Sequence, residues 1–200
     1  MYYKNLVLVM IMAFLFLSQT STNAEGGHEF ISRAELANLA METYEYITQE
    51  FLLPNSEQSI FNDINESQYG IRIEQVYING FMSGVGENQF SPNEMVTRSQ
   101  ATTVLYRLMK RLNTKYNNKL EESKTNINDI DDVPEWAIEA TTYMVSTGLV
   151  TLNEGNFSPN ELIEKNTLNE IVNKIKDMFV TDDSEERIDF QTFLERMHQK

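Results

Sequence analysis

Apolar residues recur at helical spacing in three long segments of the chain. The middle segment carries them at Ala101, Val104, Leu105, Leu108 and Leu112. The same five slots return downstream at one constant offset as Leu168, Ile171, Val172, Ile175 and Phe179. They also occur upstream, at a nearly equal offset, as Leu36, Leu39, Ala40, Thr43 and Ile47. Spacings of three and four predict helices with one face in a core, and repetition at a fixed period predicts a repeat architecture.

The same turn stands before two of these helices. Residues 90–94 and 157–161 both read Phe-Ser-Pro-Asn-Glu, and a basic residue follows each proline by six positions, as Arg98 and Lys165. The upstream copy has the basic residue, Arg33, without the turn. The pattern therefore predicts three helices that begin alike.

The residues around these basic positions predict where the helices begin. Ser32 with Glu35, and Thr97 with Gln100, have the spacing of a capping box. The third copy has lost that pair, because Glu164 stands at its capping position. We therefore expect the first two helix starts to be the better defined.

A second, shorter kind of helix separates the long ones. Residues 69–79 and 135–147 carry an apolar face, and Gly80 and Gly148 follow them as helix-ending glycines would. Asn-Asp-Ile precedes each, at residues 62–64 and 128–130. A complete unit thus reads Asn-Asp-Ile, short helix, glycine, turn, long helix, and the first unit has only its second half.

The two ends of the chain differ from these units. Residues 6–17 are an unbroken apolar run that follows Lys4, and the small and polar residues up to Ala24 offer a cleavage site. This pattern predicts a signal peptide over residues 1–24. Twelve apolar residues are short for a spanning helix, so we expect no membrane span once that segment is cleaved; an uncleaved anchor is the alternative. Near the other end, Phe190, Phe193, Leu194 and Met197 share one face of an expected helix over 187–198. This helix is a candidate to replace the missing short helix of the first unit.

Composition and charge narrow the function classes. A formal charge of −14 disfavours nucleic acid as a partner, because phosphate binding needs a basic face. Cysteine is absent, which excludes disulfides, thiol nucleophiles and zinc–thiolate sites. The acidic cluster at residues 129–133 lacks the glycine and ligand spacing of a calcium loop. Carboxylates such as Asp131 and Asp132 lie in polar linkers, so we expect no enzyme, no metal and no cofactor.

A basic residue just inside a helix start needs an explanation, because the helix dipole favours acidic residues there. One interpretation is an anion site, in which free helix N–H groups and the basic side chain converge on a negative ligand. The other is an ion pair with a carboxylate of a neighbouring unit. The residues alone leave both open.

The ordered motifs resemble the S-layer homology family. The resemblance extends over residues 31–179 and is carried by Phe61-Asn62-Asp63-Ile64, Gln89-Phe90-Ser91-Pro92, Val96-Thr97-Arg98-Ser99-Gln100 and Ile31-Ser32-Arg33-Ala34-Glu35-Leu36. It implies an all-α fold, a pseudo-threefold array of helix–loop–helix units. The expected divisions are a partial first repeat (25–58), a second repeat (59–116), a degenerate third repeat (125–183) and the C-terminal helix (184–200).

The resemblance also implies a function. The family binds anionic secondary cell-wall polysaccharide non-covalently, which implies a secreted, wall-associated protein of a Gram-positive-type bacterium. In this family, the basic residue of the helix-start motif and the aspartate of the first segment contribute to ligand binding. The matching positions here, together with one neighbouring tryptophan, give six candidate ligand-binding residues: Arg33, Asp63, Arg98, Asp129, Trp136 and Lys165. Lysine cannot reproduce the two-pronged grip of arginine, so we expect at most two working grooves. The alternative function is an exported scaffold that binds another exported protein.

Overall fold

The computed structural model describes residues 28–51, 59–179, 192 and 195–196. The predicted signal peptide lies outside these residues, as does most of the predicted C-terminal helix. Within them the chain forms five α-helices and no strand, which confirms the all-α prediction. The long helices are α2 (Arg33–Thr48), α4 (Arg98–Tyr116) and α6 (Lys165–Phe179), and the short ones are α3 (Gly70–Ile78) and α5 (Glu135–Ser146). A 3₁₀ turn, η1 (Ile130–Asp132), precedes α5.

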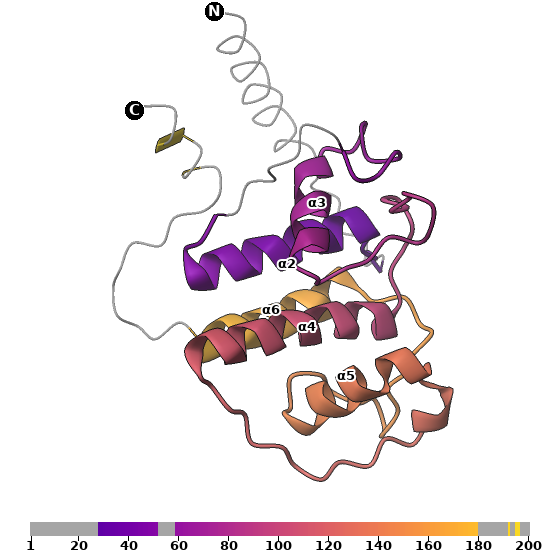
Figure 1. Cartoon of the computed structure of the whole chain (residues 1–200). Coiled ribbons are helices and arrows are strands. Elements are labelled where there is room, and N and C mark those ends of the chain that lie inside the picture. The colour runs from indigo at the N-terminus through magenta and orange to yellow at the C-terminus, as the bar shows by residue number, and fades with distance from the viewer. Residues whose placement is uncertain (1–27, 52–58, 180–191, 193–194, 197–200) are drawn as a thin grey trace, which may run out of the picture.

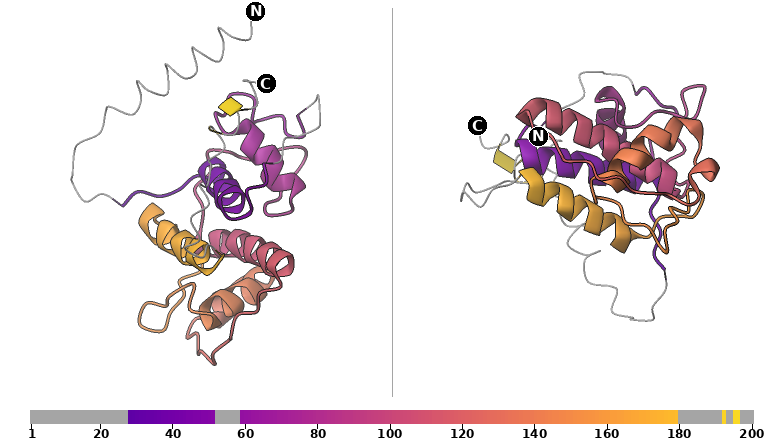
Figure 2. Two further views of the ribbon diagram at one scale, coloured as in Figure 1. Left: turned by 90° about the vertical axis from the view of Figure 1, so that its left-hand side faces the viewer. Right: turned by 90° about the horizontal axis from the view of Figure 1, so that it is seen from below.

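The three long helices form the centre of the molecule, and the short ones cover them from outside (Figures 1 and 2). Helix α3 packs on α2, and α5 packs on α4. We call α2 with α3 the first lobe and α4 with α5 the second lobe. In both lobes the covering helix is the next helix along the chain. No described helix covers α6 in the same way.

The predicted apolar faces build one core. Among the fifteen slots named above, thirteen are buried and two, Leu39 and Phe179, are partly buried against the same core. The largest fully buried side chains include Tyr44, Phe81, Phe90 and Phe157. Two of these are the phenylalanines of the repeated turn. Because burying such a side chain stabilises a fold by about 1.5–3 kcal/mol, the turns are part of the core rather than surface connections.

Helix ends follow the predicted signals. Both capping boxes are formed, with Glu35 N–H and Gln100 N–H donating to the hydroxyls of Ser32 and Thr97 at 3.3 Å. Gly80 follows α3 with φ +73°, a left-handed conformation that glycine adopts without strain. The N–H of Phe81 then donates to Val76 O at 2.9 Å, which closes the helix end.

Three junctions join the starts of the long helices into a ring. The backbone N–H of Arg33 donates to Glu94 O, that of Arg98 to Glu161 O, and that of Lys165 to Glu29 O, each at 2.8 Å. Each helix start thus binds the turn that precedes the next one, and the third start returns to the first. Glu29, which precedes α2, occupies the place of the two turn glutamates, a correspondence that the sequence analysis missed.

Candidate functional site

The guanidinium of Arg33 lies inside the loop that follows α3. Its Nε donates to Phe90 O at 2.8 Å and its Nη2 to Ser83 O at 2.9 Å. The guanidinium carbon lies 4.6 Å from the centre of the Phe90 ring. Arg33 is buried, and burial lowers its pKa. Arg33 therefore holds the turn at residues 90–94 in place and presents little of itself to a ligand.

Arg98 repeats this arrangement one unit later. Its Nε donates to Phe157 O at 2.6 Å and its Nη2 to Thr151 O at 3.3 Å. The guanidinium carbon lies 5.3 Å from the centre of the Phe157 ring. Arg98 is only half-buried, and its outer bond is long and exposed. Of the two arginines, Arg98 is the one that a ligand can reach.

Asp63 and Asp129 hold the same two turns from the other side. The carboxylate of Asp63 accepts the N–H groups of Phe90 (2.9 Å) and Ser91 (2.7 Å). That of Asp129 accepts those of Phe157 and Ser158, both at 2.7 Å. Burial acts to raise the pKa of each carboxylate. The N–H bonds, together with the positive charges of Arg33 and Arg98, outweigh this effect, so the pKa of both aspartates is lowered.

Lys165 makes the ion pair that one of the two interpretations predicted. Its Nζ lies 2.6 Å from Glu29 Oε1 and 2.9 Å from Glu35 Oε1. The bond to Glu29, followed by that to Glu35, raises the pKa of Lys165 against the effect of burial. Unlike Arg33 and Arg98, Lys165 does not bind a buried turn, because the first unit lacks that turn. The third junction is therefore closed by charges that remain partly exposed.

At the first two junctions, the helix N–H groups that the anion-site interpretation needed are already occupied. At the start of α4 the N–H groups of Arg98, Ser99 and Gln100 donate to Glu161 O, Pro159 O and the Thr97 hydroxyl. The N–H groups of Arg33, Ala34 and Glu35 are occupied in the same way at the start of α2, so an anionic ligand at these two junctions can be held by side chains but not by the helix ends. Trp136, the sixth candidate, lies near the start of α5 with 57% of its surface exposed. It makes none of the hydrogen bonds that join the other candidates.

Two further basic residues hold the covering helices, and the sequence analysis missed them. Arg107 on α4 donates to Phe81 O at 3.1 Å, just beyond α3. Lys174 on α6 donates to Gly148 O at 3.1 Å, just beyond α5. They occupy the same slot in successive repeats, so the repeat offset could have paired them. The corresponding slot on α2 holds Glu42.

The repeats match a known family. Residues 60–102 and 126–165 match the family model of the S-layer homology domain. These two segments are S-layer homology repeats. They contain Asp63, Arg98, Asp129, Trp136 and Lys165, whereas Arg33 and the predicted partial first repeat lie outside the matched segments. No curated protein matches the chain.

S-layer homology domains are wall-binding modules rather than catalytic ones, and they generally anchor proteins to cell-wall polysaccharide. They occur in surface-associated proteins, which supports association of this chain with a cell wall. None of the helices that the structure describes is long and apolar enough to cross a membrane. In the described part of the chain, no group of three or more histidine and carboxylate side chains is placed to hold a metal ion.

Proposed function

We propose that this protein is an exported module that binds an anionic secondary polysaccharide of a Gram-positive-type cell wall. The observation that carries the proposal is the second junction, where Arg98 is half-buried over Phe157 beside Asp129, within two S-layer homology repeats. Arg98 keeps its charge there and presents its outer edge to solvent. Trp136, on the covering helix of the same lobe, adds an exposed aromatic surface for a sugar ring.

The three junctions contribute unequally under this proposal. Arg33 is bound to the backbone carbonyls of Phe90 and Ser83, so it positions the turn at residues 90–94 and does not touch the polymer. Lys165 is neutralised by Glu29 and Glu35, which leaves little charge for an anionic ligand. Binding therefore depends chiefly on the Arg98 junction, with Asp63 and Asp129 shaping the turns. The formal charge of −14 weakens attraction only modestly, since salt screens charges beyond about 8–10 Å.

The test is co-sedimentation of the protein with purified wall sacculi, before and after chemical removal of the secondary polymer. Pelleting that disappears with the polymer supports the proposal. Trp136→Ala should then weaken pelleting, while Ile78→Ala, which removes a side chain of similar exposure (58%) from the first lobe, should not. Arg98→Lys keeps the charge but loses the two-pronged grip, and should weaken pelleting as well.

The second candidate is an exported scaffold that binds a protein. The burial of Arg33 and the pairing of Lys165 favour it, because both remove positive charge from the surface. Failure to pellet with either wall preparation would favour the scaffold over the wall module.

A further inference from the structure

The second half of α4 has a basic outer face. From residue 107 to residue 115 five side chains are exposed, and four of them are basic: Arg107, Lys110, Arg111 and Lys115. We call these four residues the basic face. Helix α4 carries five basic residues and no acidic one, although the whole chain has 30 acidic residues and only 16 lysines and arginines. Figure 1 shows α4 between α3 and α5, visible along its length.

The repeat itself does not require these bases. The positions aligned with Lys110, Arg111 and Lys115 hold acidic or uncharged residues in the other repeats, namely Glu45, Tyr46 and Glu50 in the first and Asp177, Met178 and Asp182 in the third. The family-model match of the second repeat ends at residue 102, before any of the three. The basic face is therefore a feature of one repeat of this chain and lies outside the matched family pattern.

Helix stability does not explain the basic face either. Arg107, Arg111 and Lys115 follow one another at four-residue steps, so like charges lie one turn apart and repel. Lys115 lies in the last turn, where the helix dipole favours a cation. Arg107 and Arg111 lie too far from that end to gain from the dipole. This row of like charges weakens the helix, and a bound anion would relieve the repulsion.

Contacts within the chain neutralise only part of the charge. The two lysines of the basic face pair with surface carboxylates, Glu139 at 3.3 Å and Glu50 at 2.7 Å. Arg107 donates to the neutral carbonyl oxygen of Phe81 at 3.1 Å. The pKa of Glu50 is lowered chiefly by its lysine partner and least by Arg111. Among the described residues neither arginine makes an ion pair, so four cations against two carboxylates leave a net charge of +2.

The basic face is separate from the Arg98 junction. Arg98 and Arg107 are nine residues apart, about two and a half helical turns, so they lie on opposite sides of α4. Arg98 contacts Phe157 and Thr151, beyond α5, whereas Arg107 reaches back to Phe81. A variant can therefore change one surface and leave the other intact.

We propose that the basic face of α4 is a second surface that binds a linear, negatively charged polysaccharide. Its ends, Arg107 and Lys115, lie about 12 Å apart along the helix, so an extended polymer can meet several of its charges at once. Guanidinium groups donate in a fork that matches carboxylates and phosphates. None of the exposed large apolar residues of the described chain lies between Arg107 and Lys115. Because a protein partner needs apolar contacts at the centre of its interface, this favours a polysaccharide.

This inference deepens the proposed function. That the polymer comes from a cell wall rests on that function, whereas the binding of an anionic polysaccharide to α4 does not. The two surfaces together would hold different stretches of polymer, and the basic face would supply the more salt-sensitive part of the binding.

The test is a titration of the ¹⁵N-labelled chain with polygalacturonate, a linear polymer of uronic acids, and with neutral dextran. Polygalacturonate should shift the amide signals of Arg107, Lys110, Arg111 and Lys115, and dextran should not. Arg111→Gln/Lys115→Gln should weaken the binding of polygalacturonate about fivefold or more. Raising sodium chloride from about 0.05 to about 0.5 M should weaken the binding of the parent chain about tenfold or more, because counterions compete.

The matched control is Lys119→Gln/Lys124→Gln, which makes the same charge change at exposed positions of the linker that follows α4. It should keep the affinity for polygalacturonate within about twofold. Circular dichroism checks that each variant is folded. Arg111→Gln alone removes no ion pair of the described chain, and should still weaken binding about twofold or more if the double variant unfolds.

Three results of the titration would overturn the inference. They are the absence of shifts along α4, an equal loss of affinity in the control, and tighter binding of polyglutamate than of polygalacturonate, which would indicate an acidic protein as the partner. Sacculi separate this inference from the proposed function. Equal pelleting of the parent chain and Arg111→Gln/Lys115→Gln would overturn only the role of α4. Failure of the parent chain to pellet would overturn the proposed function and, with it, the wall origin of the polymer.

Discussion

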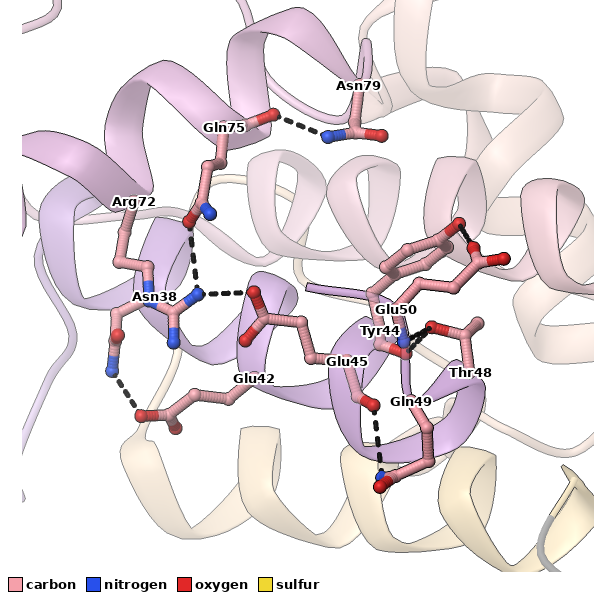
Figure 3. Close-up of polar contacts among 10 residues, drawn as sticks. All are labelled: Asn38, Glu42, Tyr44, Glu45, Thr48, Gln49, Glu50, Arg72, Gln75 and Asn79. Atoms are coloured by element: carbon pink, nitrogen blue, oxygen red, sulfur yellow. Dashed lines mark hydrogen bonds and ion pairs between the residues drawn. The ribbon is translucent and has the colours of Figure 1, made fainter. Parts of the chain in front are cut away.

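Both lobes have an ion pair at the same position, but the pair is buried in the first lobe and exposed in the second. In the first lobe Glu45 and Arg72 are 2.7 Å apart, with side chains 2% and 8% exposed. In the second lobe Lys110 and Glu139 are 3.3 Å apart, with side chains 64% and 73% exposed. Figure 3 shows that Arg72 also reaches Gln75, which lies one turn along α3. The two lobes therefore share the charge pair but differ in how far solvent can reach it.

Burial changes what such a pair contributes. Burial raises the pKa of Glu45, and Arg72 acts against that rise. The second oxygen of Glu45, Oε2, is buried without a hydrogen-bond partner in the described part of the chain. A buried pair contributes little net stability, but losing one member leaves a charge that water cannot reach. We therefore expect the stability of the first lobe to depend on its ion pair and that of the second lobe not to.

The largest expected effect comes from breaking the buried pair. Arg72→Met should lower the free energy of unfolding by about 3–5 kcal/mol, because Glu45 is left buried and uncompensated. Glu139→Gln, the control in the second lobe, should change it by less than about 1 kcal/mol. Urea unfolding followed by circular dichroism measures both. Restoration of stability in the double variant Glu45→Met/Arg72→Met would show that the unpaired charge causes the loss. Equal effects in the two lobes would mean that burial does not decide the difference.

A smaller difference is expected between the arginines of the first two junctions. Arg33→Met leaves the buried carbonyl of Phe90 without its donor and should cost about 2–3 kcal/mol. Arg98→Met should cost about 1 kcal/mol, because Arg98 is half-buried and water can replace its long outer bond to Thr151. The same unfolding experiment compares them. An Arg98 variant as unstable as the Arg33 variant would contradict the unequal burial of the two junctions.

The sequence predicted the helices and their core faces well, because both depend on local spacing. The slots from Ala101 to Leu112 are buried as expected, and both capping boxes are formed. The start of α3 at Gly70 and the end of α5 at Ser146 each differ from expectation by one residue. Such ends vary with the hydrogen bonds of the last turn.

Local sequence patterns could not predict which groups the candidate site residues contact. Nothing near Arg33 in the sequence indicates that its guanidinium meets carbonyls 50 and 57 residues away. The ring closure through Glu29 was missed because the first unit lacks the turn that marks the other glutamates. Position 42 shows what the repeat offset adds, since aligning it with Arg107 and Lys174 reveals the acidic exception.

Acid should affect the two lobes alike, because Asp63 and Asp129 hold equivalent turns. Both carboxylates have a lowered pKa in the folded chain, so their contribution is present above the unfolded value of about 3.9 and is lost as pH falls through the folded pKa. Asp63→Asn and Asp129→Asn should each lower the free energy of unfolding by about 1–2 kcal/mol at pH 7. The difference from the parent chain should vanish near pH 2. Unfolding midpoints from pH 7 to pH 2 test this, and a deficit that grows in acid would reverse the assigned direction.

The smallest effect is expected at the third junction, where exposed charges replace the buried turn. Lys165→Met should change the free energy of unfolding by less than about 1 kcal/mol, because the side chains of its partners Glu29 and Glu35 are 74% and 33% exposed. The remaining contribution should be screened by salt, so the parent and the variant should converge between 0.05 and about 0.5 M sodium chloride. Arg33→Met should keep its deficit over the same range, since its lost contacts are buried hydrogen bonds to neutral carbonyls. A salt-independent loss at Lys165 as large as that at Arg33 would mean that the backbone contact to Glu29 depends on the lysine, and would contradict the expectation that exposed charges hold the third junction.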